Sequence, residues 1–214
     1  MAPWARVNRA WSAEAGTRWS NDSLRQVLMS LAARDQAARK DLGSRVGDSA
    51  YARALGALDA TLATALAAIL DRYGLPTRSL VGAAGADAAM LITQHSWSLQ
   101  ERVLGLALKA APDEISPQAL AMLEDRVLVH QGKSQRYGTQ FNLGANGVFH
   151  FAVTHDLAGL EARRTRMGIP PLGQYVCLME EAGMRIDRSS LPPMPGASGQ
   201  RKPPASLGPQ RHGL

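Results

Sequence analysis

Apolar residues recur at every third or fourth position through much of the first 130 residues, a spacing typical of amphipathic helices. The longest of these stripes lies within residues 49–73 and is followed by Gly74, a residue type that commonly ends helices. Ser116 and Pro117 form a strong helix start, because serine can cap a helix that carries proline in its first turn. Further helices are expected after Asn21, between Gly85 and His95, over residues 99–111, from Asp156 to about Met167, and after Pro171.

The spacing changes to a period of two after Gln135, where aromatic and polar side chains alternate as they do in a strand. Alternation resumes at Phe149, and the intervening residues 144–147 contain the Asn-Gly pair that favours hairpin turns. A lone hairpin is only marginally stable in water, so this one should pack on the helices. We therefore expect a mainly α fold, a multi-helix single domain with one small β-hairpin near residues 135–154.

The helical domain is expected to cover residues 21–187, with an arm before it and a tail after it. The arm, residues 1–20, holds three tryptophans at a spacing that suits one face of a helix. It is expected to dock on the domain, and a partner-binding helix is the alternative. The tail, residues 188–214, is rich in proline and lacks acidic residues. Such a composition is typical of a disordered segment.

The positive charge of the chain argues little for nucleic acid as a partner. The formal net charge is +6 at pH 7, and four of these charges lie in the tail, which leaves +2 on residues 1–187. The basic residues of the tail are scattered and have no aromatic neighbours on which bases could stack. No apolar run reaches the roughly 20 residues of a membrane span, and the N-terminus lacks a signal-peptide pattern. We expect a cytoplasmic protein that binds neither nucleic acid nor a membrane.

Polar residues interrupt the apolar helix faces at two places in the first half of the chain. Asp35 stands where a hydrophobic residue is expected, and Arg39 lies one turn further along, where the two can pair. Gln94 precedes His95, which shares a face with apolar residues of the alanine-rich helix. A buried carboxylate is costly unless it is paired. Asp35 should therefore meet a cation, either Arg39 or Arg126, or several hydrogen-bond donors.

A third polar group follows in the second half of the chain. It begins with Asp125 and Arg126 near the end of a helix and continues in the segment Gln135-Arg-Tyr-Gly-Thr-Gln140. Glycine at position 138 would let the backbone approach a ligand closely. Hydroxyl and amide groups beside it would orient that ligand.

Two functional interpretations are open. In the first, the polar groups line a pocket between the helices and the hairpin, and the protein is an enzyme acting on a small molecule or peptide. His95 would transfer the proton, since its ordinary pKa lies near neutrality, and Asp35 or Asp125 would orient it or hold a cationic substrate group. Arg126 and Arg136 would bind an anionic group. The full set of expected substrate-binding residues is Arg39, Gln94, Arg126, Gln135, Arg136, Tyr137, Thr139 and Gln140.

In the second interpretation the same residues form a structural network or recognise a partner, and the protein is a non-catalytic binding or interaction module. Neither a metal nor a cofactor is expected. The single cysteine excludes a multi-thiolate zinc site, and no phosphate-binding or dinucleotide-binding glycine motif is present. The sequence carries no signal of oligomeric state.

Several motifs are distinctive in combination. They are Asp35-Gln36 with Arg39, Asp71-Arg-Tyr-Gly-Leu-Pro-Thr-Arg-Ser-Leu-Val-Gly82, Gln94-His95, Leu123-Glu-Asp-Arg-Val-Leu-Val129, and Gln135-Arg-Tyr-Gly-Thr-Gln140. Together they resemble a bacterial family of unknown function, domain of unknown function family 6624, over about residues 21–180. Leu75 stands where that family usually has tryptophan before the proline. The resemblance supports the map of the site and implies no particular reaction.

Overall fold

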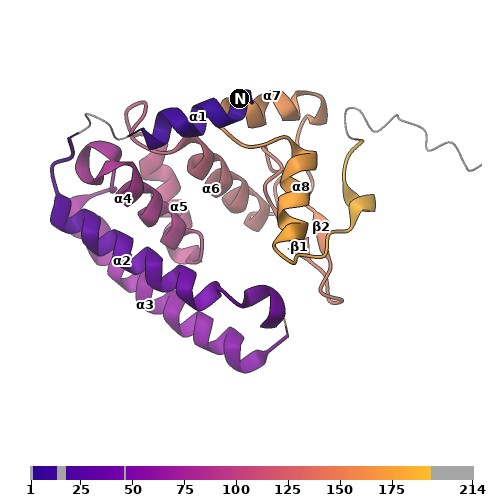
Figure 1. The fold of residues 1–214 in the computed structure, drawn as a ribbon, viewed down its shortest axis with the longest axis horizontal. Coiled ribbons are helices and arrows are strands. Elements are labelled where there is room, and N and C mark those ends of the chain that lie inside the picture. Colours follow the sequence, from indigo (N-terminus) through magenta and orange to yellow (C-terminus); the bar gives the residue numbers. More distant parts are fainter. Residues whose placement is uncertain (1, 14–17, 46, 194–214) are drawn as a thin grey trace, which may run out of the picture.

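The computed structural model describes residues 2–13, 18–45 and 47–193, whose arrangement is shown in Figure 1. These residues form eight α-helices and one two-stranded sheet, which confirms the expected mainly helical single domain with a small hairpin. The helices are α1 (Pro3–Ser12), α2 (Asp22–Arg39), α3 (Ser49–Tyr73), α4 (Arg78–Thr93), α5 (Trp97–Ala107), α6 (Pro117–His130), α7 (Leu160–Arg166) and α8 (Leu172–Glu181). The strands are β1 (Phe141–Leu143) and β2 (Phe149–Phe151), and short 3-10 helices are η1 (Leu42–Arg45), η2 (Leu157–Gly159) and η3 (Arg188–Ser190).

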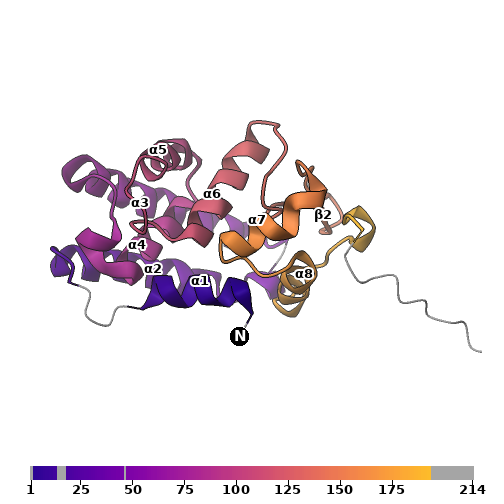
Figure 2. The same cartoon turned by 90° about the horizontal axis from the view of Figure 1, so that it is seen from above.

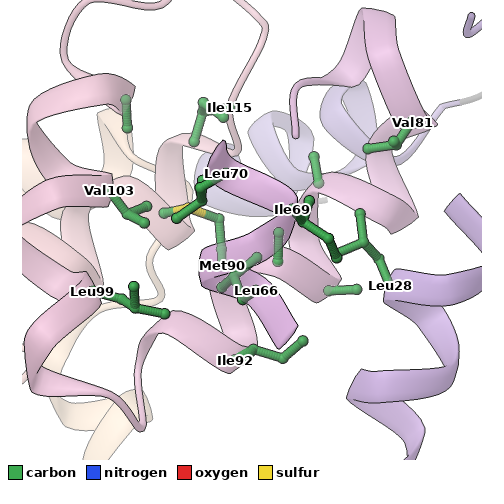
Figure 3. Packing of buried hydrophobic residues seen from close by; sticks show 14 of the residues in the cluster. Leu28, Leu66, Ile69, Leu70, Val81, Met90, Ile92, Leu99, Val103 and Ile115 are labelled. Atoms are coloured by element: carbon green, nitrogen blue, oxygen red, sulfur yellow. The ribbon is translucent and has the colours of Figure 1, made fainter. Parts of the chain in front are cut away.

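The alanine-rich helix α4 lies at the centre of the helical part and contacts α2, α3, α5 and α6. Small side chains such as Ala86 and Ala89 are buried in these contacts and allow the neighbouring helices to approach closely. Larger side chains of the neighbours fill the remaining space, among them Leu28 of α2, Leu66 of α3 and Val103 of α5 (Figure 3). Close packing around α4 therefore holds the helical part together.

The helix α4 begins earlier and ends earlier than the sequence pattern predicts. The sequence pattern predicts that Gly82 and Gly85 lie in a loop before this helix, but only Gly82 leaves helical geometry, with φ 72° and ψ 168°. Gly85 lies inside the helix, where an added Cβ would come within 2.8 Å of the Val81 Cβ. The helix stops at Thr93, so His95 lies in the turn after it and not on its face.

The hairpin is shorter than its alternating pattern predicts. The two strands pair antiparallel over three residues each, with Phe141 opposite Phe151. Residues 135–140 precede β1 as a loop, because several of their backbone groups bond to the side chains of Asp125 and Arg164 instead of a strand. The hairpin packs on α7 and α8 through a small apolar cluster of its own.

The N-terminal helix α1 docks on two parts of the domain that are far apart in the sequence (Figure 2). Trp11 is buried, and its indole Nε1 donates a hydrogen bond of 2.9 Å to Asp87 of α4. Asn8 Nδ2 donates a bond of 2.8 Å to the carbonyl of Gly168, which follows α7. Contacts of α1 with α4 and α7 therefore link the helical part to the part that carries the hairpin.

The first residues of the expected tail are part of the folded domain. The helix η3 contacts β2, and the Phe151 N–H donates a bond of 2.8 Å to Ser190 Oγ. His150 Nδ1 and Asp187 Oδ2 lie 3.0 Å apart at the same junction. The remainder of the expected tail, residues 194–214, lies outside the described residues.

One described helix, α3, is long and apolar enough to cross a membrane by length and composition alone. Only 28% of the most apolar 18-residue stretch of this helix is buried within the protein. Leu62 and Leu66 belong to its buried face, and α3 contacts α2 and α4. Core helices of soluble proteins satisfy the same criterion, so the absence of a membrane partner stays a prediction.

Candidate functional site

Asp35 lies at the centre of a chain of charged side chains. It is fully buried on α2, and its Oδ1 accepts a bond of 3.0 Å from Arg39 Nε, the pairing that the spacing of four residues predicts. Arg39 also forms an ion pair with Asp59 of α3. Gln36 Nε2 donates a bond of 2.9 Å to Asp35 Oδ2. The Arg39 guanidinium and the Gln36 amide therefore replace the water that the Asp35 carboxylate loses on burial, which offsets the cost of burying its charge.

His95 lies beside this carboxylate. Its Nε2 is 3.7 Å from Asp35 Oδ2, which is too long for a hydrogen bond but close enough for the charges to interact. The His95 N–H donates a bond of 3.2 Å to the Ile92 carbonyl, which fixes the backbone in a tight turn after α4. Burial, and secondly the positive charge of Arg39, lower the pKa of His95, while the Asp35 carboxylate opposes this shift. The side chain is 25% exposed, so the imidazole is accessible to a substrate.

Arg126 approaches the same centre from α6. Its Nη1 donates a bond of 3.2 Å to the Gln94 carbonyl, which also accepts a bond of 2.9 Å from Gln100 Nε2. Burial lowers the pKa of Arg126, and its charge in turn contributes to the lowered pKa of His95. Its Nε is buried without a hydrogen-bond partner, and no carboxylate within the described ranges forms an ion pair with it. Among the residues that the structure describes, the Gln94 carbonyl is therefore the one hydrogen-bond partner of this half-buried cation.

Asp125, the second carboxylate that the sequence predicts for the site, is enclosed by hydrogen-bond donors. It is fully buried on α6 and accepts bonds of 2.7 to 3.0 Å from the N–H groups of Arg136, Tyr137 and Thr139 and from the Thr139 hydroxyl. Burial raises the pKa of Asp125, although each of these donors acts to lower it. Because both carboxylate oxygens are occupied, Asp125 anchors the 135–140 loop on α6 and presents no exposed oxygen to a substrate.

Two further buried side chains close the 135–140 loop. Gln135 is fully buried, donates through Nε2 to the Gln140 carbonyl and accepts a bond of 2.8 Å from the Gln140 N–H. Arg164 of α7 is also fully buried and donates through Nη1 to the carbonyls of Tyr137 and Gly138, at 2.6 and 2.9 Å. Burial lowers the pKa of Arg164 to about 10, so it stays charged at neutral pH. Gln135 is thus part of the scaffold of the loop.

The other loop residues that the sequence predicts to bind a substrate differ from one another in exposure and in hydrogen-bond partners. Arg136 is about half exposed and pairs with Glu124 at 2.7 Å. Tyr137 is buried, and its hydroxyl donates a bond of 3.3 Å to the same Glu124. Gln140 Nε2 donates a bond of 3.0 Å to the hydroxyl of Thr139, whose side chain is committed to Asp125.

The expected site therefore divides into two groups. The first is built around His95, and its other members are Asp35, Arg39, Gln94 and Arg126. The second is the loop scaffold around Asp125, with Gln135, Tyr137, Thr139 and Gln140, while Arg136 lies at the surface. Only the first group holds a titratable base that is partly open to solvent.

Three residues of the two groups were not expected from the sequence. Asp59 completes the ion-pair chain, Arg164 binds the loop, and the Tyr175 hydroxyl of α8 lies 3.4 Å from the Thr139 carbonyl. Burial raises the pKa of Tyr175, and the charges of Arg164 and Arg126 oppose this. Asp59 adjoins an apolar stripe, a signal that was already present in the sequence. An arginine in a short helix carries no comparable signal.

A cleft of about 530 Å³ adjoins the His95 group between α2, α4 and α6. Alanine and methionine side chains form most of its wall, including Met122 of α6. Gln36 and Gln94 also line it, and these are the sequence neighbours of Asp35 and His95. The cleft therefore lies next to the proposed base and does not enclose it.

Within the described residues, no group of three or more histidine, cysteine or acidic side chains is arranged to hold a metal ion. His150 instead pairs with Asp187, and Asp156 pairs with Arg163. The His95 group itself consists of imidazole, carboxylate, guanidinium and amide groups.

A model of a protein family described as a family of unknown function (DUF6624) matches residues 22–187. The match covers the whole of the His95 group and the whole loop scaffold, and it excludes α1. Neither curated proteins nor solved structures include a match to the chain.

Proposed function

The chain belongs to the DUF6624 family, whose function is unknown, and we propose that it is an enzyme acting on a small molecule or peptide with His95 as its acid–base group. The observation that carries the proposal is the position of His95. A partly exposed imidazole of lowered pKa lies 3.7 Å from the buried, arginine-paired carboxylate of Asp35 and next to a cleft. Perturbed titratable groups beside a cleft are typical of active sites.

The lowered pKa makes His95 a proton acceptor at neutral pH, because most of its imidazole is then unprotonated. Asp35 is on the Nε2 side of the ring. It would orient the imidazole and stabilise the imidazolium that forms when Nδ1 takes a proton from the substrate. Closure of the 3.7 Å separation to a hydrogen bond on substrate binding is in keeping with the loose geometry of unliganded sites.

The other residues have supporting roles in this proposal. Arg39 holds Asp35 in place through the ion pair between the two side chains. Arg126 and Gln94, which are joined by the bond from Arg126 Nη1 to the Gln94 carbonyl, would bind the substrate. Asp125 and Gln135 act as positioning residues, because they fix the loop and do not reach an open surface.

The proposal is tested by comparing the wild-type protein with His95→Gln in mixtures of small metabolites and peptides followed by mass spectrometry. We expect wild-type protein to consume at least one compound and His95→Gln to lose this activity by roughly a hundredfold or more. The matched control is His155→Gln, since His155 is an exposed histidine outside the site. Equal turnover by wild type and His95→Gln would end the acid–base proposal.

A second candidate, a non-catalytic binding module, is supported by the loop scaffold. Asp125, Gln135 and Arg164 direct most of their hydrogen bonds at the 135–140 loop, as in a structural network. The two candidates differ in what His95→Gln does. For a binding module this variant would leave partner or ligand affinity unchanged, and no compound would be consumed by either protein.

A further inference from the structure

The cleft beside His95 has the size and the lining of a site for an apolar group. Its volume of about 530 Å³ lies within the range of roughly 300 to 1,000 Å³ that small-molecule sites occupy. Met29, Ala33, Ala88, Leu91, Ala119 and Met122 are among its lining residues. Because alanine side chains are small, they leave space between the helices, and flexible methionine side chains adapt to apolar groups of different shape.

The cleft extends along the helices toward the His95 group. Residues four apart on a helix share a face, and Met122 of the cleft lies four residues before Arg126 on α6. Leu91, in the last turn of α4, also lines the cleft, and His95 lies in the turn that directly follows this helix. Gln94 connects the two regions, because its side chain lines the cleft while its carbonyl accepts the bond from Arg126. From residue 84 to residue 94, α4 rises about 15 Å along this path.

The two ends of the cleft differ in charge. Asp87, which accepts a bond from Trp11, lines the cleft seven residues before Gln94 on α4, whereas Arg126 lies at the Gln94 end. Arg126 is half-buried, its Nε is buried without a bonded partner, and no carboxylate within the described ranges pairs with it. A buried charge without a counter-charge is costly. A single carboxylate matches one guanidinium in charge and can accept two of its hydrogen bonds. A phosphate monoester would bring nearly two charges and would call for further donors.

From these observations we infer that the protein binds a small-molecule carboxylate with an apolar chain or ring. The apolar part occupies the cleft between α2, α4 and α6, and the carboxylate pairs with Arg126. The inference rests on the proposed function in one respect, which is that this carboxylate would be the substrate, or part of it, on which His95 acts. Binding itself does not require His95.

The test is calorimetric titration of the full chain with octanoate, octanol and acetate, each below the concentration at which it forms aggregates. Octanoate carries both features of the inferred ligand, octanol lacks the charge, and acetate lacks the chain. We expect saturable binding of octanoate that is at least roughly tenfold tighter than that of either of the other two. No saturable binding of octanoate, or equal affinity for octanol, would overturn the inference.

Matched variants locate the binding site. Ala33 and Ala37 are both exposed alanines of α2, but only Ala33 lines the cleft. Ala33→Trp should fill the cleft and weaken octanoate binding by at least roughly tenfold, whereas Ala37→Trp should change it by less than about twofold. Equal affinities of Ala33→Trp and wild type would show that octanoate binds elsewhere and would overturn the inference.

The charge is tested separately. Arg126→Gln should remove the preference for octanoate over octanol, Arg126→Lys should retain part of it, and Arg34→Gln, which removes an exposed charge from α2, should retain all of it. Thermal melts establish that each variant is folded. A full preference for octanoate in folded Arg126→Gln would overturn the assignment of the carboxylate to Arg126.

His95→Gln separates this inference from the proposed function. The variant should bind octanoate within about twofold of wild type. If it binds octanoate and also retains full turnover, the acid–base proposal fails and the inference stands. If wild type shows no octanoate binding but consumes another compound in a His95-dependent reaction, the inference fails and the acid–base proposal stands.

Discussion

At the scale of single residues, Asp125 and Arg126 are neighbours on α6, but their side chains differ in how many hydrogen-bond partners they have. Asp125 is surrounded by four donors and has no exposure to solvent. Arg126 has one bonded carbonyl and an Nε without a partner. Adjacent helical residues point about 100° apart, so one faces the 135–140 loop and the other the His95 group. This contrast indicates that the carboxylate holds the structure and the guanidinium is available to a ligand.

Asp125→Asn should reduce the free energy of unfolding by about 2 to 4 kcal/mol, because the amide group would place N–H donors opposite the N–H groups of the loop. Urea denaturation followed by circular dichroism measures the change. The control is Asp71→Asn, since Asp71 is 68% exposed in its pair with Arg102. This surface pair should account for less than about 1 kcal/mol. A similar small effect at both positions would contradict the anchoring role of Asp125.

The pKa of His95 should lie below about 6.5 in the folded protein, as measured by the pH dependence of its imidazole NMR signals. Asp35→Asn should lower this pKa further, since the carboxylate raises it, and Arg126→Gln should increase it. A general base of this kind gives activity that falls as the pH drops through the pKa of His95. A pKa above the ordinary value would contradict the environment described for this residue.

The same shift links His95 to stability. Between its folded pKa and about pH 6.5, the unfolded chain binds the proton more readily than the folded chain does. The contribution of His95 to stability is therefore fully present above about pH 6.5 and declines as the pH falls through this window. His95→Gln should remove this part of the pH dependence.

At the scale of secondary-structure elements, the sequence indicates where most helices occur but not where α4 ends. The helical spacing continues through Gln94 and His95, whereas the helix stops at Thr93. The Gln94 carbonyl is bonded by Gln100 and Arg126, which come from other helices. These partners satisfy the end of α4 and are not visible in its local sequence. The position of His95 after the helix follows from these tertiary contacts.

The 135–140 loop has a similar origin. Its alternating sequence is typical of a strand. Its backbone groups instead form hydrogen bonds with the charged side chains of Asp125 and Arg164, and such bonds are stronger than those of a β-ladder. Its turn is made possible by Gly138, which has φ +65°. The tertiary contacts therefore replace the first part of the expected strand with a loop.

Gly138→Ala should be more destabilising than Gly147→Ala. Both glycines have positive φ, so each alanine should cost about 1 to 2 kcal/mol in backbone strain. Only at Gly138 would the new Cβ also crowd a neighbour, at 3.0 Å from Phe151 Cζ, while the position at Gly147 has nothing within 4 Å. The difference in unfolding free energy between the two variants, measured in urea, should exceed about 0.5 kcal/mol. Equal losses would mean that Phe151 moves away without cost.

At the scale of the whole molecule, α1 links the helical part to the part that carries the hairpin. It contacts α4 and α7, which are far apart in the sequence. Figure 2 shows it lying along the side of the domain, across both parts. Of its two tryptophans, Trp11 is the buried one and Trp4 is only partly buried. The family match begins after this helix, at residue 22. The helix α1 therefore lies outside the region shared with the family and packs against it.

Trp11→Ala should reduce the free energy of unfolding by about 3 kcal/mol, because it leaves a cavity and removes the hydrogen bond from the indole to Asp87. Hydrogen exchange measured by mass spectrometry should show faster exchange in both α4 and α7. Trp4→Ala is the control and should have a smaller effect on both measurements. Unchanged exchange in α7 would contradict the linking role of α1.

The sequence by itself determined that the protein is mainly helical and where most helices begin. It also determined that a hairpin follows the first six helices. These features depend on local physics: the period of apolar residues, the cap at Ser116 and the turn residues before Phe149. It also placed Arg39 within reach of Asp35, since residues four apart on a helix are neighbours, and the structure shows that the two pair.

Only the tertiary structure decided which polar residues lie together. The sequence predicts the same catalytic role for Asp35 and Asp125, each a carboxylate of an amphipathic helix. One lies beside His95, which is 60 residues away in the chain, and the other is enclosed by the 135–140 loop. The physical reason is that a buried carboxylate takes its environment from whichever donors the packed helices bring to it. Those donors come from segments whose relative positions no local pattern specifies.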